Sequence, residues 1–156
     1  MNRYRIALIA GAVVLFAVGV TLYSLQSVTT IEEVDGETAH ERFVTVLAPL
    51  DSTDALLQRD TEGRWIRSER TNDPTASGLK RIGVLAYRPD SERLYRMEIP
   101  FWFYRMKGPA LGFVLRDTGF DLGDLGIQPK DLLRHGPGLV LNEEQQDGGR
   151  IVVWVE

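Results

Sequence analysis

The chain of 156 residues has no cysteine and only two histidines. Without cysteine it can form no disulfide, no thiolate zinc centre and no thiol nucleophile. His40 and His135 would need carboxylates to complete a zinc site. Asp117, Asp121 and Asp124 lie close together in sequence, but their spacing differs from that of known calcium-binding loops. We therefore expect no metal and no cofactor.

Motifs for covalent and phosphate chemistry are missing as well. No serine lies in a Gly-x-Ser-x-Gly turn, and no glycine-rich loop ends in Gly-Lys-Ser or Gly-Lys-Thr. Residues 117–119, "DTG", resemble the active-site turn of aspartic proteases. However, Arg116 stands where that family usually has an apolar residue, and Phe120 stands where it usually has a small one. We interpret these residues as a polar turn, predict no catalytic residues and do not expect an enzyme.

Positive charge is scarce outside one segment. The formal net charge is −4, and residues 64–116 hold eleven Lys and Arg against five Asp and Glu. The segments on either side, residues 26–63 and 117–156, are acidic. The acidic balance argues against a nucleic-acid partner. The basic segment would attract lipid headgroups or an acidic protein surface.

Charge is absent altogether from residues 6–25, which are rich in Ala, Val, Leu and Gly. As a helix this run would be about 30 Å long, the thickness of the hydrocarbon core of a bilayer. Tyr4 and Tyr23 lie near its two ends, where interfacial aromatic residues are common. The run also lacks a good small-x-small cleavage site. It therefore predicts a transmembrane helix rather than a cleaved signal peptide.

The charges beside this span predict its orientation. Arg3 and Arg5 precede it in the tail of residues 1–5, whereas the first charges after it are acidic. Basic flanks stay in the cytoplasm. We therefore expect a single-pass protein of the cell (inner) membrane, with a cytoplasmic N-terminus and a periplasmic or otherwise extracytoplasmic C-terminal domain. Two pairs of small residues would let the span pack against another helix: Ala7 with Gly11, and Ala17 with Thr21.

The rest of the chain is expected to hold one domain. Residues 26–40 are polar and acidic, and we interpret them as a stalk. Residues 41–156 suffice for one domain of class α+β, with a small, mostly antiparallel sheet and short helices. At its start, residues 42–50 favour a strand, and Ser52 or Thr53 can cap a short helix.

Two hairpins are the strongest local signals. Residues 79–99 alternate around the turn "PDS", and the alternation gives one apolar face formed by Ile82, Val84, Ala86, Tyr95, Met97 and Ile99. Residues 138–156 form a second hairpin around "EEQQDGG". Its last strand is apolar on both faces, which predicts a buried central strand. A further short strand is predicted around Trp65.

Two short helices are predicted in the second half of the chain. Pro100 suits the first turn of a helix that ends before Gly108. The segment "QPKDLLRHG" predicts a second helix, with Pro129 at its start and Gly136 as its C-cap. Between them, residues 111–115 can form a short strand.

Four aromatic residues follow Pro100 directly: Phe101, Trp102, Phe103 and Tyr104. On a helix they fan through about 300°, and on a strand they alternate between two faces, so one core cannot hold all four. In one interpretation, two or three rings fill the core and the Tyr104 hydroxyl is exposed. In the other, the run docks on the membrane or on another protein, together with Arg105 and Lys107. Tryptophan, tyrosine and arginine are typical interface anchors.

These features favour an interaction module over an enzyme. We expect an accessory, assembly or scaffolding subunit of a membrane protein complex, which contacts other membrane proteins and the lipid bilayer. The alternative is a membrane-tethered hydrolase or small-ligand-binding domain that uses the loops of residues 108–138.

Overall fold

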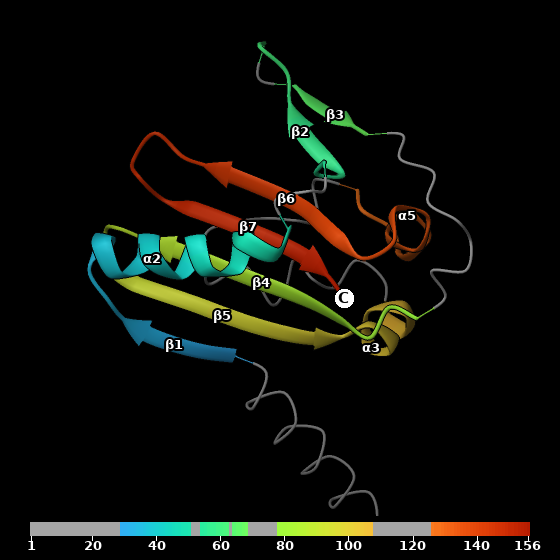
Figure 1. Ribbon diagram of the computed structural model, residues 1–156, viewed down its shortest axis with the longest axis horizontal. Coiled ribbons are helices and arrows are strands. Elements are labelled where there is room, and N and C mark those ends of the chain that lie inside the picture. Colours follow the sequence, from blue (N-terminus) through green and yellow to red (C-terminus); the bar gives the residue numbers. More distant parts are fainter. Residues whose placement is uncertain (1–28, 51–53, 63, 69–77, 108–125) are drawn as a thin grey trace, which may run out of the picture. The chain divides into compact units, whose positions relative to one another are not determined.

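The computed structural model describes five stretches of the chain, residues 29–50, 54–62, 64–68, 78–107 and 126–156 (Figure 1). Internal contacts separate Met1–Thr30 from Ile31–Glu156, and the second unit contains the folded domain.

Several predictions concern residues outside these stretches. They are the tail 1–5, the span 6–25 with Ala7, Gly11, Ala17 and Thr21, the acidic turn at 117–119, and the strand at 111–115. Among the described residues, no helix is long and apolar enough to cross a membrane. The transmembrane helix stays a prediction.

The domain is built on one sheet of seven strands, in the order β1-β5-β4-β7-β6-β2-β3. The strands are β1 (Thr29–Glu33), β2 (Leu57–Arg59), β3 (Trp65–Arg67), β4 (Arg81–Arg88), β5 (Arg93–Pro100), β6 (Gly138–Glu144) and β7 (Arg150–Val155). Because β2 runs parallel to β6, the sheet is mixed rather than wholly antiparallel. A small, mostly-sheet domain with a few short helices is confirmed.

The first predicted hairpin is confirmed in its position and in its predicted apolar face. β4 pairs antiparallel with β5, and Ile82, Val84 and Ala86 lie opposite Ile99, Met97 and Tyr95. All six side chains are buried. Alternation along a strand is a local property, so the sequence alone was enough to predict this face.

The second hairpin, β6 and β7, is confirmed as well, and β7 occupies the middle of the sheet (Figure 1). β7 pairs with β4 on one side and with β6 on the other. Its residues from Ile151 to Val155 are all buried. A strand with neighbours on both sides and covered faces needs apolar residues at every position, as the sequence indicated.

The prediction for residues 42–50 was wrong. They form the end of helix α2 (Gly36–Leu47) and the 3-10 turn η1 (Ala48–Leu50). Asp35 caps the helix, because its Oδ1 accepts a hydrogen bond from the Thr38 amide at 2.7 Å. Ala39 and Phe43, four residues apart, are the buried residues of α2. Packing of this apolar stripe on the sheet outweighs the local strand propensity.

Helix α2 lies across one face of the sheet (Figure 1). Its Ala39 and Phe43 share one buried cluster with Leu85, Tyr87, Leu94, Val152 and Trp154 from the central strands. Gly83 of β4 makes room for the Trp154 indole, since a Cβ at this glycine would lie 2.1 Å from the ring. The ring therefore lies directly on the β4 backbone.

Part of the stretch predicted as a stalk, residues 26–40, forms regular secondary structure. That stretch contains β1 and the first turn of α2. Val34, between them, donates from its amide to the Glu92 carbonyl at 2.9 Å, at the start of β5. The acidic residues of this stretch lie on an exposed edge strand and near a helix start.

The short helix predicted after Ser52 or Thr53 is not formed by the described residues that follow. Leu57–Arg59 is strand β2 instead. Its Leu57 pairs with Leu141 of β6, and the Leu56 amide donates to the Leu139 carbonyl at 3.1 Å. These partners are distant in sequence, so no local pattern could have indicated them. The strand predicted around Trp65 is β3.

Candidate functional site

Helix α3 (Phe101–Lys107) begins where the first hairpin ends. Pro100 is the last residue of β5, and the Phe101 amide donates to the Lys80 carbonyl at 2.8 Å. Phe101 and Tyr104, three positions apart, are both buried. Their side of the helix therefore faces the domain, in accord with helical periodicity.

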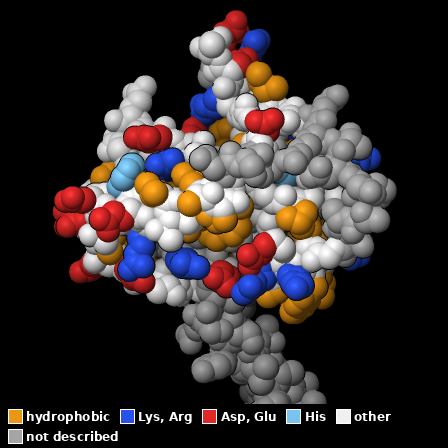
Figure 2. Space-filling view, viewed as in Figure 1, with side chains coloured by type: hydrophobic (Ala, Val, Ile, Leu, Met, Phe, Trp, Pro, Cys, Tyr) orange, Lys and Arg blue, Asp and Glu red, His pale blue; other side chains and the backbone are white. Residues whose placement is uncertain are grey.

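The other side of α3 carries an apolar stripe of Trp102, Phe103 and Met106. Trp102 and Met106 are each 64% exposed, and Phe103 is half-buried. The rings of Trp102 and Phe103 meet edge to face, with their centroids 5.9 Å apart. Figure 2 shows hydrophobic side chains reaching the surface over α3, beside charged ones. We call these three residues the α3 stripe.

Tyr104 lies on the buried side of α3. One interpretation of the sequence expected its hydroxyl to be exposed, and that expectation was wrong. The hydroxyl donates to the Ile127 carbonyl at 2.6 Å. Burial, together with the negative charge of Asp131, raises the pKa of Tyr104 to about 12. This phenol is therefore a neutral structural donor at ordinary pH.

Helix α5 (Pro129–His135) begins two residues after Ile127, and its own contacts involve Asp131. Asp131 is buried, and its Oδ2 accepts from the Gln128 amide at 2.9 Å. The same oxygen lies 3.1 Å from Nη1 of Arg67 on β3. Sequence reasoning missed this ion pair, because Arg67 and Asp131 come from distant segments. The helix itself, its Pro129 start and the Gly136 C-cap were predicted correctly.

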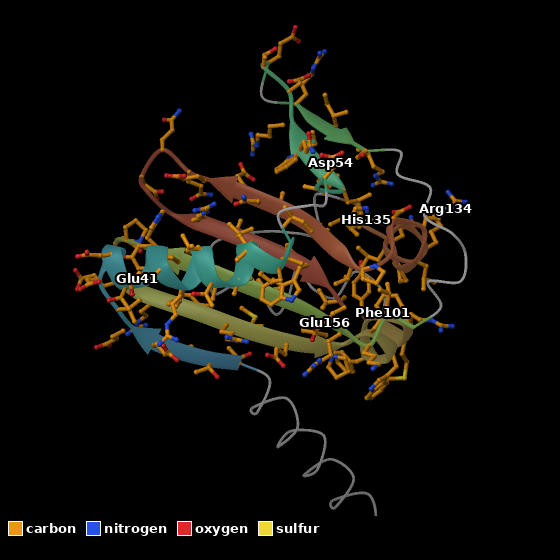
Figure 3. The ribbon with its side chains drawn as sticks, in the orientation of Figure 1. Glu41, Asp54, Phe101, Arg134, His135 and Glu156 are labelled. Carbon is orange, nitrogen blue, oxygen red and sulfur yellow. The ribbon has the colours of Figure 1, made fainter. Side chains whose placement is uncertain are left out.

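His135 at the end of α5 is completely buried. Its Nε2 lies 2.8 Å from the Leu139 carbonyl, at the start of β6 (Figure 3). His40, by contrast, is exposed on α2. Across the described residues, no group of three or more His, Cys, Asp and Glu side chains could hold a metal ion.

A separate apolar cleft of about 350 Å³ opens between η1 and the ends of β6 and β7. Val46, Pro49, Leu50, Pro137, Gly138, Trp154, Val155 and Glu156 line it. Among the described residues, Glu156 supplies the only charged side chain of the lining (Figure 3). This cleft takes Pro137 and Gly138 from the segment that the alternative hypothesis invoked, whereas residues 108–125 lie outside the described part of the chain.

The structure thus divides the predicted docking residues into two groups. Phe101 and Tyr104 are buried, whereas Trp102, Phe103 and Arg105 lie on the other side of α3 or at its margin. Lys107 ends the helix. Met106 was not singled out from the sequence, although its spacing of four from Trp102 would have placed it on the same stripe.

Comparison of the chain with protein families, with curated proteins and with solved structures finds no match. A proposal for its function therefore depends on the chain's own sequence and geometry.

Proposed function

We propose that this chain is a single-pass, membrane-anchored interaction module with an extracytoplasmic domain, and that it serves as an accessory, assembly or scaffolding subunit of a membrane protein complex. The α3 stripe is the observation that carries the proposal. While the neighbouring Phe101 and Tyr104 are buried, its Trp102 and Met106 are exposed. A docking surface on a membrane protein or on lipid would cover them.

The sequence supports the membrane part of the proposal. The uncharged run of residues 6–25 has the length of a span, and Arg3 and Arg5 precede it. Small residues of the span, Ala7 and Gly11 or Ala17 and Thr21, would allow a partner helix to approach closely. The domain would then face the extracytoplasmic side.

Gentle extraction tests the proposal directly. The full-length tagged chain should stay with membranes through an alkaline carbonate wash, because a transmembrane helix resists extraction. After cross-linking and solubilisation in mild detergent, mass spectrometry should identify at least one other membrane protein bound to it. A chain with residues 1–25 removed is the matched control and should lose both properties. Recovery of a lone full-length monomer would contradict a role as a complex subunit.

One observation favours the alternative of a small-ligand-binding domain. The cleft beside η1 is apolar, and the one charged side chain that the described residues give it is Glu156, which pairs with Arg81 at 2.8 Å. Ligand sites commonly combine an apolar lining with one or two polar groups. If the cleft holds a ligand, native mass spectrometry of the gently extracted chain should show a bound small molecule. Replacement of Leu50, which is half-buried in the lining, by Asp should remove it.

A further inference from the structure

We infer that the α3 stripe inserts into the interfacial layer of the lipid bilayer, with Arg105 at the headgroups. The domain would then contact the membrane that anchors it through this stripe. The inference rests on the proposed membrane anchor and specifies which surface of the domain meets the lipid. Four observations lead to it.

The first is the length of chain between the predicted span and the domain. The span ends at residue 25, and β1 starts at Thr29. Residues 26–28 lie between them, and the four steps from residue 25 to Thr29 cover at most about 14 Å even when fully extended. The entry point of the chain into the sheet must therefore lie close to the bilayer surface, if residues 6–25 cross it.

The second observation is where β1 enters the sheet. β1 is the neighbour of β5, and Val34, just after β1, bonds to Glu92, just before β5. The strands therefore run in opposite directions, as their arrows show in Figure 1. The start of β1 lies along the later half of β5, which leads through Pro100 into α3.

The third observation is the pattern of side chains around α3. At about 100° per residue, Trp102, Met106 and Phe103 fall within one arc of about 100°, opposite the buried pair Phe101 and Tyr104. Arg105 is exposed beside this arc. An apolar arc with a basic margin is the pattern of a helix that lies in the plane of a membrane interface.

The fourth observation is charge. Arg81 and Arg96 both pair with Glu98, at 3.2 Å and 3.3 Å. Arg105 has no ion pair with any residue that the structure describes, and it remains available for a lipid phosphate. Exposed Lys80 lies next to the start of α3, since its carbonyl accepts from the Phe101 amide. Both cations would be attracted to anionic headgroups.

The absence of cysteine makes a specific test possible. The full-length Met106→Cys chain, labelled with the fluorophore NBD, is reconstituted into vesicles of phosphatidylcholine with a minority of phosphatidylglycerol. Nitroxide-labelled lipids then report the depth of the label. The matched control is Ile66→Cys, because Ile66 is also exposed, at 51%, but lies on β3 at the other edge of the sheet.

We expect the label at residue 106 to shift its emission to the blue and to lie about 5–10 Å inside the headgroup boundary. The label at residue 66 should keep the emission of a probe in water. Adding Arg105→Glu to the Met106→Cys chain should reduce quenching by the lipid in the anionic vesicles. Unchanged quenching would overturn the assignment of Arg105 to the headgroups.

Other outcomes separate the inference from the proposed function. If the chain floats with the vesicles but the labels at 106 and 66 behave alike, the anchor is correct and the lipid contact of α3 is wrong. If the label at 106 becomes shielded only when a cross-linked protein is present, the surface belongs to a protein partner. If the chain does not float with the vesicles at all, the membrane-anchored function itself fails.

Discussion

The Tyr104 hydroxyl links α3 to the start of α5 through its hydrogen bond to the Ile127 carbonyl. Replacement of Tyr104 by Phe keeps the ring and removes this bond. We expect the free energy of unfolding to fall by about 1–2 kcal/mol, because a buried carbonyl then loses its donor. Chemical denaturation of a fragment of residues 26–156 measures the change.

Trp102→Ser in the same fragment is the control. Trp102 is 64% exposed, so its loss should change stability by no more than about 0.5 kcal/mol. A large destabilisation by Trp102→Ser would show that this ring is part of the core, and the α3 stripe would then have no docking role.

Tyr104 also predicts an alkaline limit on stability. Its pKa is raised from 10.0 to about 12 in the folded domain. The folded state therefore holds the proton more tightly than the unfolded state, so the stabilisation is complete below pH 10 and is lost as the pH rises toward about 12. Denaturation curves across this range should converge for the wild type and Tyr104→Phe. Parallel curves would contradict the assignment.

At the scale of elements, Arg67 and Asp131 join the edge hairpin of β2 and β3 to α5. Replacement of Arg67 by Met keeps the length of the side chain and removes the charge, so buried Asp131 loses one of its two partners. We expect a destabilisation of about 1–3 kcal/mol. Hydrogen exchange should also accelerate at the first turn of α5.

The control for this prediction is Arg64→Met. Arg64 pairs with Asp60 and Glu62 at 2.9 Å in each case, but its own side chain is 72% exposed. Exposed ion pairs contribute little, so the variant should remain close to the wild type. Equal effects of the two substitutions would mean that the ion pair between β3 and α5 stabilises the domain no more than an exposed ion pair does.

The elements also show which sequence signals were sufficient. The position and one buried face of the hairpin of β4 and β5 were predicted, because alternation and turn residues are local. Burial of Leu85, Tyr87 and Leu94 on its opposite face was not predicted. Residues 42–47 of α2 were predicted as a strand, because Val44, Thr45 and Val46 favour strands locally. The helix instead buries Phe43 in one cluster with the distant Leu85 and Trp154. β2 was mistaken for a helix for the same reason.

The candidate site was only partly visible in the sequence. The run of four rings indicated that one core could not hold them all, but not which would be exposed. That choice depends on where α3 packs, which buries Phe101 and Tyr104 and pairs the Tyr104 hydroxyl with the Ile127 carbonyl. The cleft beside η1 could not be foreseen, since it is lined by residues from α2, η1, β6 and β7.

At the scale of the whole molecule, the proposed arrangement depends on a short connection. Each large apolar side chain that leaves water contributes about 1.5–3 kcal/mol, so the three residues of the α3 stripe alone would hold lipid weakly. A tether of about 14 Å raises the effective concentration of α3 at the bilayer. We expect a long Gly-Ser insertion after residue 25 to reduce lipid quenching of the label at residue 106.

A rigid insertion of the same length, rich in Pro, should reduce quenching further, because it holds the domain away from the bilayer rather than letting it fold back. If neither insertion changes the quenching, the α3 stripe binds lipid without help from the anchor. The short connection would then not be needed for the lipid contact of α3.

The amino-acid sequence by itself determined the two hairpins, one buried face of the first, the central place of the last strand, and the start and end of α5. These follow from alternation, turn residues and caps, which act over a few positions. Only the tertiary structure decided that residues 36–47 form a helix, that β2 joins β6, and that Trp102 is exposed while Tyr104 is buried. Each of these depends on contacts between segments far apart in the chain, whose energies no local pattern contains.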